Sequence, residues 1–176
     1  NKIIGVCRGR MEFGPRALGN RSILADARNV RAQTHINLKV KFRESFRPFA
    51  AILLKDDAKK YFGFVKKSPY MLIVTKLIEK YRLKVSKKLN KNLINYLQQK
   101  RSEISAVTHV DYSTRLQIVE KNNKFIFDLL KDYKKNTGVG VLVNTSFNVK
   151  DEPIVSDIFD ALNCFYNTEI DILVLG

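Results

Sequence analysis

Residues 9–22 hold three arginines, three glycines and one proline in a stretch with little hydrophobic periodicity. Glycine lets the backbone adopt left-handed angles or approach a ligand closely. The guanidinium group of arginine is a planar fork of donors that suits phosphate or carboxylate oxygens. This composition indicates an anion-binding loop. An ordinary surface turn with solvated side chains at Arg10, Arg16 and Arg21 explains it equally well.

More cations and small polar side chains lie in other loops beside apolar strands. In residues 41–48 the cations Lys41, Arg43 and Arg47 are interleaved with aromatic residues, and Arg115 begins a predicted strand. Three small polar side chains follow another predicted strand: Asn144, Ser146 and Asn148. Sheets of α/β proteins place ligands at such strand ends. Cations converging on one cleft would hold a polyphosphate for phosphoryl or adenylyl transfer; for each arginine alone, a surface ion pair is the simpler explanation.

Several other kinds of chemistry have little support. Neither His35 nor His109 has neighbours that would make it a convincing base for a nucleophile. His109, near Asp111, is the better candidate, but a histidine satisfied inside a strand is the simpler explanation. Cys7 and Cys164 lie far apart among apolar neighbours, so we expect buried free thiols, as in a cytoplasmic protein. Neither cysteine has metal-ligand spacing with a histidine, and we expect no metal site.

The length and charge of the chain bound its organisation. A chain of 176 residues, 45% hydrophobic, suits one domain with a sizeable core. No apolar run is long enough to cross a membrane. Both ends fall at apolar elements, so we expect residues 1–176 to form a single domain of a longer protein.

About half of the net charge of +15 falls in residues 76–101. Lysines and apolar residues there each recur at three- and four-residue steps, which predicts an amphipathic helix with a solvated lysine face. The alternative is that this face binds an anionic partner such as RNA.

Apolar runs and periodicities predict the elements that would position the candidate residues. Strands are expected over residues 3–7, 49–54, 70–75, 106–111, 115–119, 139–143 and 171–175. Helices are expected over residues 29–39, over 76–101 and from 125 to just before Thr137-Gly138, with a last helix N-capped by Ser156. Because strands and helices mix along the whole chain, the predicted class is α/β or α+β, a twisted mixed sheet with flanking helices.

Four motifs occur in order along the chain: GRMEFGPRALGNRS at residues 9–22, VKFRE with FRPFA at 40–50, THVD with Arg115 at 108–115, and VNTSFN with EPIV at 143–155. Together they resemble the C-terminal domain of the O-carbamoyltransferase family, whose members modify nodulation factors and antibiotics such as tobramycin and cephamycin. The likeness covers nearly the whole chain. Residues 82–103 lie outside it and resemble a lysine-rich helical insertion.

The resemblance implies a YrdC-like fold and a reaction. In this family the domain takes carbamoyl phosphate and ATP, the latter with Mg²⁺, and makes carbamoyl adenylate with release of pyrophosphate. A metal-binding N-terminal domain, missing from this sequence, then transfers the carbamoyl group to a hydroxyl. No membrane is implied, and nucleic acid is an unlikely partner.

The resemblance also assigns roles by matched position. It implies that four cations bind the phosphates of both substrates. These are Lys41, Arg47 and Arg115 as catalytic residues and Arg16 as a binding residue. It implies that Asn144 and Ser146 hold the carbamoyl and adenylate groups. The wider Lys-x-Arg and Ser-x-Asn pattern of the fold adds Arg43 and Asn148.

The sequence departs from the family pattern at a few positions. Ala27 replaces a usual proline, Asp151 a usual glycine, and Tyr112-Ser113 a usual Gly-Thr. Asp tolerates the left-handed backbone that a glycine would allow at position 151. Two other interpretations stay open: a basic RNA-binding module related to tRNA-modification proteins, and a scaffold domain that only docks its partner domain.

Overall fold

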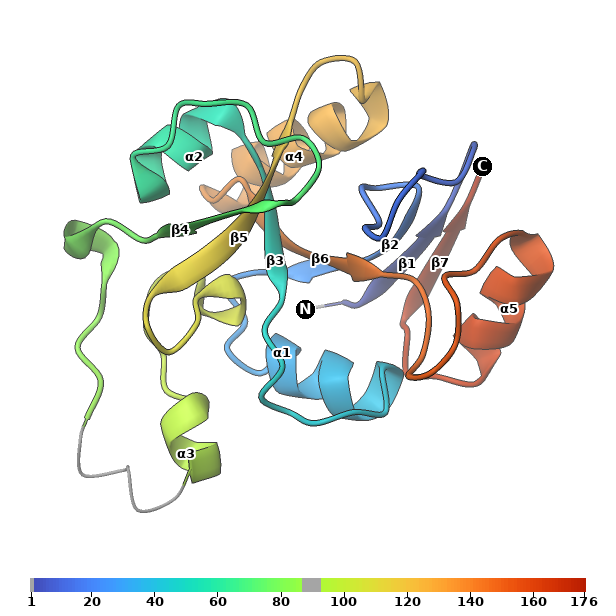
Figure 1. The fold of residues 1–176 in the computed structure, drawn as a ribbon, viewed down its shortest axis with the longest axis horizontal. Coiled ribbons are helices and arrows are strands. Elements are labelled where there is room, and N and C mark those ends of the chain that lie inside the picture. The colour runs from blue at the N-terminus through green and yellow to red at the C-terminus, as the bar shows by residue number, and fades with distance from the viewer. Residues whose placement is uncertain (1, 87–92) are drawn as a thin grey trace.

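The computed structural model describes residues 2–86 and 93–176, in which seven strands form one mixed sheet. Figure 1 shows the twisted sheet running across the molecule with helices around it. The strand order is β4-β5-β3-β6-β2-β1-β7, so that β6 lies at the centre and the sheet does not close. The strands are β1 (Ile4–Cys7), β2 (Arg21–Asp26), β3 (Ala50–Leu54), β4 (Ile73–Lys76), β5 (Ser113–Val119), β6 (Val141–Ser146) and β7 (Ile172–Leu175).

Helices and short helical turns connect the strands. One of them, α1, continues directly into a π-helix, η1. The helices are α1 (Ala32–His35), η1 (Ile36–Val40), α2 (Lys55–Phe62), α3 (Leu93–Leu97), α4 (Lys124–Thr137) and α5 (Ile158–Tyr166), and the 3₁₀ turns are η2 (Glu79–Tyr81) and η4 (Ser105–Val107). None of the described helices is long and apolar enough to span a membrane.

The register of the sheet decides which side chains share a face. β6 pairs antiparallel with β3 and β2, which places Asn144 opposite Ala50 on one side and Leu24 on the other. β3 pairs in parallel with β5, and β1 with β7. Since side chains alternate along each strand, Asn144 and Ser146 of β6 point to the same face.

Two separate hydrophobic cores cover the two faces of the sheet. The larger one joins strand residues such as Leu53 and Val143 to buried residues of α1, η1, α2 and α5. The smaller one joins Ile52 and Leu142 to Ile126 and Leu130 of α4. Within the described chain, the second face is therefore covered by α4 beside the ends of β3 and β6 that carry Ile52 and Leu142. Asn144 lies further along that face of β6, opposite Leu24 of the smaller core on one side, and its side-chain amide donates to Gln117 of β5.

The ends of two helices show why the chain turns where it does. α4 carries an amphipathic pattern and ends at Gly138, which adopts the left-handed angle φ of 78° that favours glycine. α5 begins at Asp157, whose carboxylate accepts a hydrogen bond from the backbone N–H of Asp160. The predicted cap, Ser156, is wrong by one residue: its hydroxyl instead donates to the Asp160 carboxylate at 2.7 Å.

The class and most strands are confirmed. Strands appear within or beside the predicted ranges 3–7, 49–54, 70–75, 115–119, 139–143 and 171–175. The predicted helix at 29–39 appears as α1 and η1, and Cys7 and Cys164 are buried free thiols as expected. β2 and α2 were not predicted. β2 begins with the polar residues Arg21 and Ser22, which interrupt the apolar pattern expected of a buried strand. α2 is a short helix that directly follows β3, so it has no separate apolar pattern of its own length.

The predicted helix over residues 76–101 is wrong. Leu77 enters the core, and its carbonyl accepts a hydrogen bond from Arg82 Nε at 2.7 Å. The backbone N–H of Leu83 donates to the carbonyl of Arg101 at 2.8 Å, so the chain returns on itself. The lysines of the predicted face that fall in 87–92 lie outside the described residues.

The predicted strand over residues 106–111 is also wrong. Hydroxyl groups wind this segment into the turn η4: Thr108 Oγ1 donates to the carbonyl of Ile104, and Ser105 Oγ to the carbonyl of Ser102. Such local side-chain bonds compete with strand pairing. His109 therefore lies in a loop, not inside a strand.

Candidate functional site

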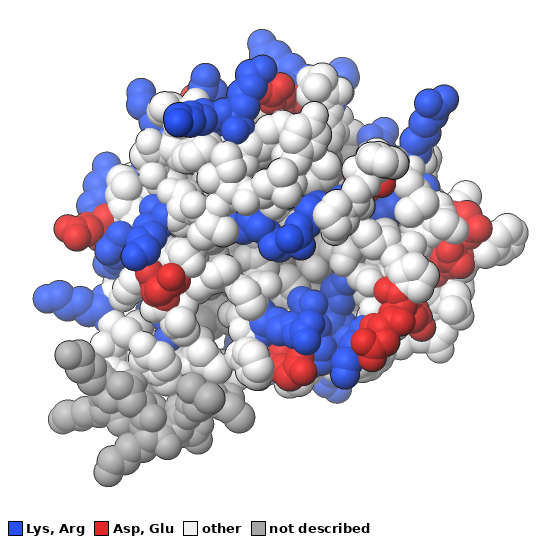
Figure 2. Space-filling model, viewed as in Figure 1, with Lys and Arg blue, Asp and Glu red and all other residues white. Residues whose placement is uncertain are grey.

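A small cavity of about 130 Å³ lies on the sheet face beyond α4. Its floor is formed by Arg115 of β5 and by Asn144 and Ser146 of β6, and the loop after β1 contributes Arg16. Arg43, from the loop after η1, also lines it. We call this cavity the arginine cleft. Figure 2 shows positively charged side chains gathered across the middle of this view of the molecule.

Two arginines of the cleft carry charge that the protein does not neutralise. Among the described residues neither Arg16 nor Arg115 forms an ion pair, and the Nε atoms of both are buried without a hydrogen-bond partner. Burial, together with the nearby Arg16, lowers the pKa of Arg115. Both residues are half-buried, and a buried N–H of a charged group that lacks a hydrogen-bond partner costs free energy. The arrangement therefore favours an anion that brings the missing negative charge.

The loop that carries Arg16 has a defined shape. The carboxylate of Glu12 accepts hydrogen bonds from the backbone N–H groups of Leu18 (2.9 Å) and Asn20 (2.6 Å), which closes the loop on itself. Gly19 has a φ of 125°, and a Cβ there would lie 2.6 Å from a side-chain carbon of Ile126 on α4. Only glycine fits this position, so the loop is held against α4 and Arg16 is held over the sheet.

A second cavity of about 200 Å³ continues from the arginine cleft. Arg43 and Ser146 line both cavities, which makes them one polar groove. The second cavity is also lined by Lys41, Arg47 and Asn148. Thus all eight residues predicted for the site line this groove; they are Arg16, Lys41, Arg43, Arg47, Arg115, Asn144, Ser146 and Asn148.

Lys41 is buried at the base of the second cavity. Its ammonium group donates to the backbone carbonyl and hydroxyl oxygens of Ser146 and to Asn148 Oδ1, the last at 2.6 Å. Burial, reinforced by the neighbouring charge of Arg43, lowers its pKa to about 7. Because all three N–H groups are used inside the protein, Lys41 orients Ser146 and Asn148 and acts on a ligand through its charge.

The other two cations of this loop are held differently. Arg43 Nε donates to Asn37 Oδ1 at 2.7 Å, and its guanidinium lies 5.3 Å from the ring centre of Phe49. Burial and the charge of Arg47 lower the pKa of Arg43. Arg47 is half-exposed and pairs with Glu44 at 2.9 Å. A polyphosphate can therefore recruit Arg47 only by competing with a carboxylate.

Arg21, grouped with the loop cations on sequence, has a structural role instead. Its buried guanidinium donates to the backbone carbonyls of Arg8, Gly9, Asn20 and Ser156. It therefore ties the ends of the glycine-rich loop to the segment before α5. Arg10, from the same motif, is exposed and lines neither cavity of the groove.

Sequence reasoning missed Gln117, which supports the floor of the cleft. Its amide donates to the carbonyl of Leu18 at 2.7 Å and accepts from Asn144 Nδ2 at 2.6 Å. Asn144 Nδ2 also donates to the carbonyl of Ala17, while Asn144 Oδ1 is buried without a partner. The sequence signal that could have found Gln117 is the alternation of side chains along a strand, which places Gln117 on the same face of β5 as Arg115.

No three His, Cys, Asp or Glu side chains come together as metal ligands among residues 2–86 and 93–176. The groove itself offers cations, amides and hydroxyls. Such a donor set suits a metal only if the metal arrives on the phosphates of its ligand.

These features define a class of protein: an α/β domain with a cationic groove on one face of its sheet. Over residues 1–176 the chain matches the family described as carbamoyltransferase C-terminus, and it belongs to that family. It is 49% identical to an uncharacterised protein of Synechocystis, over 98% of this chain and 28% of that protein. It is 42% identical to the nodulation protein NolNO of Sinorhizobium fredii, over 99% of this chain and 23% of the relative.

A third relative is the nodulation protein NolO of Bradyrhizobium diazoefficiens, which is 41% identical over 99% of this chain and 29% of its own length. The chain thus spans about a quarter of the length of these curated relatives.

Proposed function

We propose that this domain makes carbamoyl adenylate from carbamoyl phosphate and ATP and releases pyrophosphate. The observation that carries the proposal is the pair of half-buried arginines, Arg16 and Arg115, that line one small polar cavity with buried Nε atoms lacking a hydrogen-bond partner in the described structure. Membership of the carbamoyltransferase family supports the carbamoyl group as the group that is transferred. Two polyanionic substrates repel each other, and closely placed cations offset that repulsion.

The proposed reaction balances in two steps. Water cleaves carbamoyl phosphate to carbamate and inorganic phosphate, with release of a proton. An oxygen of carbamate then attacks the α-phosphorus of ATP, the bond from that phosphorus to the bridging oxygen of the β-phosphate breaks, and pyrophosphate leaves. The carbamate oxygen is already ionised, so this attack needs no general base. The groove supplies positioning and charge.

The size of each cavity suggests how the groove divides this work. The arginine cleft, at about 130 Å³, suits a small group such as carbamoyl phosphate, with Asn144 and Ser146 beside its uncharged end. The larger cavity around Arg43, Arg47 and Asn148, at about 200 Å³, suits the phosphates of ATP. We propose that Mg²⁺ is carried by those phosphates. The carbamoyl group then passes to a hydroxyl in a further, N-terminal metal-binding domain, as part of an O-carbamoyltransferase of the cytoplasm.

Pyrophosphate release tests the proposal in the protein that contains this sequence. Release should require both ATP and carbamoyl phosphate, and Arg115→Ala should slow it by about 10²–10³-fold, the usual effect of removing one electrostatic donor from a reacting centre. Arg31→Ala is the matched control, because Arg31 is an exposed arginine outside the groove. Pyrophosphate release that does not require carbamoyl phosphate, or that has the same rate in Arg115→Ala, would contradict the proposal.

The alternative of a basic RNA-binding module rests on the net charge of +15, on the lysine-rich segment 76–101 and on the resemblance to tRNA-modification proteins. The continuous lysine-bearing helix predicted for 76–101 is absent from the described residues of that range, where α3 covers Leu93–Leu97. Unpaired cations in the structure instead face a small, walled cavity. The groove therefore favours small anions.

A further inference from the structure

Asn144 is almost fully buried in the floor of the arginine cleft, and one atom of its amide has no partner. The residue is 1% exposed. Its Nδ2 donates to the backbone carbonyl of Ala17 at 3.0 Å and to Gln117 Oε1 at 2.6 Å, so both N–H groups are used inside the protein. Its Oδ1 is buried without a hydrogen-bond partner in the described structure. Asn144 therefore brings an unused acceptor, and no unused donor, to the cleft.

Two backbone carbonyls fix the direction of this amide. Rotation of an asparagine or glutamine amide by half a turn exchanges its oxygen and nitrogen, but a carbonyl can only accept a hydrogen bond. The carbonyl of Leu18 accepts from Gln117 Nε2 at 2.7 Å, which turns Gln117 Oε1 toward Asn144. The carbonyl of Ala17 likewise requires the nitrogen of Asn144. A reversed Asn144 amide would place oxygen against oxygen at both contacts.

The register of the sheet allows the two amides to meet. Gln117 lies on β5 and Asn144 on β6, with β3 between them. On β3, Ile52 pairs with Gln117 and Ala50 pairs with Asn144. Neighbouring strands lie about 4.8 Å apart, so the two side chains bridge roughly 10 Å across β3. The methyl group of Ala50 leaves room for this contact, and Gln117 can therefore hold Asn144 from two strands away.

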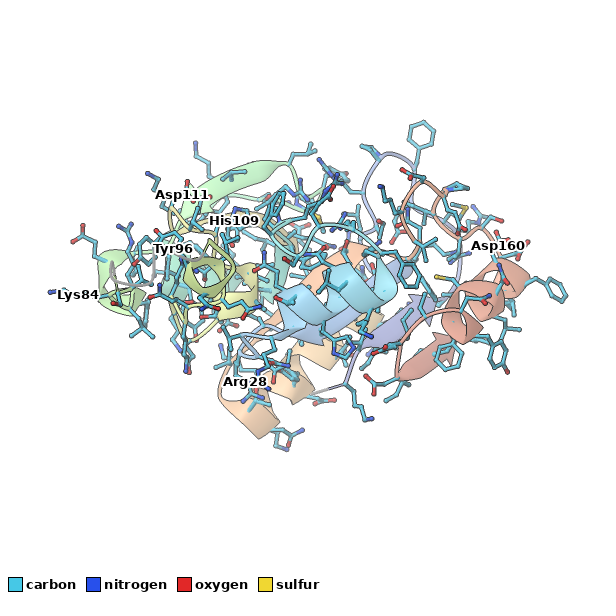
Figure 3. All side chains as sticks on the ribbon, turned by 90° about the horizontal axis from the view of Figure 1, so that it is seen from below. Arg28, Lys84, Tyr96, His109, Asp111 and Asp160 are labelled. Carbon is cyan, nitrogen blue, oxygen red and sulfur yellow. The ribbon has the colours of Figure 1, made fainter. Side chains whose placement is uncertain are left out.

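The other side chains around the cleft do not replace this acceptor. In the described part of the chain no carboxylate lines the arginine cleft. Asp111 and His109 line a neighbouring cavity instead, and Figure 3 shows these two side chains close together. The hydroxyl of Ser146 already forms hydrogen bonds within the protein. Among the side chains that line the cleft, Asn144 Oδ1 is thus the buried acceptor left without a donor.

We propose that Gln117 positions Asn144 so that Asn144 Oδ1 accepts a hydrogen bond from the amino group of carbamoyl phosphate. The proposal rests on the proposed function, since it takes carbamoyl phosphate as the ligand of the cleft. Arg16 and Arg115 bind the phosphate of this ligand, and its amino group is the donor that Oδ1 lacks. A ligand with a methyl group in that place leaves Oδ1 unpaired, which is costly for a buried acceptor. The Gln117–Asn144 pair therefore determines specificity.

Two stable phosphonates test the proposal by calorimetry in the protein that contains this sequence. Phosphonoacetamide keeps the amino group of carbamoyl phosphate, acetonylphosphonate has a methyl group in its place, and a CH₂ group replaces the ester oxygen in both. Phosphonoacetamide should bind at least about tenfold more tightly. Gln117→Met removes an acceptor that holds Asn144 and should lower this affinity ratio by about threefold or more. Gln117→Glu keeps an acceptor for Asn144 Nδ2 and should keep the ratio.

A control and a second measurement separate the outcomes. Gln98→Met should leave the ratio unchanged, because Gln98 is exposed and lines neither cavity of the groove. In the wild type, the resonance of the Asn144 carboxamide carbon should shift with phosphonoacetamide and not with acetonylphosphonate, which tests the contact without a substitution.

Three results would overturn the inference: equal affinities for the two phosphonates, a ratio that Gln117→Met leaves unchanged, or the same loss of ratio in Gln117→Glu as in Gln117→Met. If neither phosphonate binds in a manner that depends on Arg115, the proposed function itself fails, and the role of the Gln117–Asn144 pair fails with it.

Discussion

Lys41 is the buried cation of the candidate site, and its three hydrogen bonds all lie within the protein. Its ammonium group is surrounded by acceptors from Ser146 and Asn148, yet burial and the charge of Arg43 lower its pKa to about 7. An anion in the groove would offset the positive charge of Arg43 and so favour the protonated form of Lys41. Ligand binding and protonation of Lys41 are therefore coupled.

We expect proton uptake when tripolyphosphate binds at pH 8. The free protein then holds Lys41 mainly neutral, because pH 8 lies above its pKa, and the bound anion raises that pKa and protonates it. At pH 6 the lysine is already protonated, so its uptake should vanish. Calorimetry in buffers of different ionisation enthalpy counts the protons, and Lys41→Met corrects for those of the ligand. Equal proton counts for wild type and variant at pH 8 would contradict the coupling.

Two residues that replace usual glycines both take left-handed angles: φ is 63° at Asp151 and 62° at Tyr112. The expectation for Asp151 is confirmed. Tyr112 gains a role from its side chain, since its hydroxyl donates to the carbonyl of Leu83 at 2.8 Å and its ring lies 5.3 Å from the guanidinium of Arg82. It therefore ties residues 82–86 to the loop before β5.

We expect Asp151→Gly to stabilise the protein by up to about 1 kcal/mol, because a left-handed angle costs a residue with a Cβ roughly 1–2 kcal/mol and Asp less than most. Tyr112→Gly should give no such gain, since it also loses the contacts with Leu83 and Arg82. Urea unfolding measures both changes. Destabilisation by Asp151→Gly would show that the carboxylate has a role that outweighs the strain.

At the scale of elements, a buried ion pair links helices that pack on opposite faces of the sheet. Asp57 of α2 is fully buried and lies 2.9 Å from the ammonium of Lys134 on α4. A Cβ at Gly140, just before β6, would lie 2.5 Å from the Asp57 carboxylate. Figure 1 shows α2 and α4 near the same end of the sheet. The pair therefore fixes α4, and with it the loop that packs on Ile126.

Lys134→Met should destabilise the protein by about 2–3 kcal/mol, because it leaves the Asp57 carboxylate buried without a counter-charge. The value lies at the low end for buried pairs since the Lys134 side chain is partly exposed. Lys135→Met, at the exposed neighbouring position, is the control and should change stability by less than about 0.5 kcal/mol. Denaturant unfolding compares the two, and equal stability of both variants would contradict a structural role for the pair.

The elements that sequence reasoning predicted best are those with an uninterrupted apolar pattern, such as β3 and α4. The two failures have different causes, tertiary contacts in one segment and local side-chain hydrogen bonds in the other. Leu77 and Arg101 draw residues 76–101 into contacts with the core and with each other, and hydroxyl bonds of Ser105 and Thr108 wind a segment that alternates like a strand. The spacing of apolar residues along the chain does not predict such contacts.

The eight candidate residues were chosen by motif, and the structure places them along one groove, while their function as a site stays a prediction. The motifs could not predict which of these cations form hydrogen bonds or ion pairs within the protein. Arg21 is saturated by backbone carbonyls, Arg47 is paired with Glu44, and Arg16 and Arg115 keep buried atoms without partners. These differences arise from which carbonyls and carboxylates the fold brings near. The YrdC-like fold and the roles of the individual residues stay predictions.

At the scale of the whole molecule, the groove gathers positive charge in a chain that already carries +15. Such charge destabilises the compact state by self-repulsion. Ligand anions relieve it locally, and any ligand that binds only the folded state stabilises that state by mass action.

We expect tripolyphosphate at about 100 times its dissociation constant to stabilise the fold by about 2.7 kcal/mol, which raises the melting temperature by roughly 5–10 °C for a chain of this size. Thermal unfolding followed by circular dichroism measures the shift. Sulfate at matched ionic strength controls for general screening, and Arg115→Ala should shrink the response. A shift of the same size in Arg115→Ala would place the stabilising anions outside the arginine cleft.

The groove has a floor and walls of different construction. Its floor belongs to β5 and β6, each of which pairs with a strand on both sides, while its walls are the loop that carries Arg16 and the loop that carries Arg43. Amide hydrogens of β6 should exchange with solvent only when the whole domain opens, and those of the loops much sooner. A ligand would then slow exchange in the walls first. Recognition by this domain would amount to the ordering of two loops against an unmoving surface.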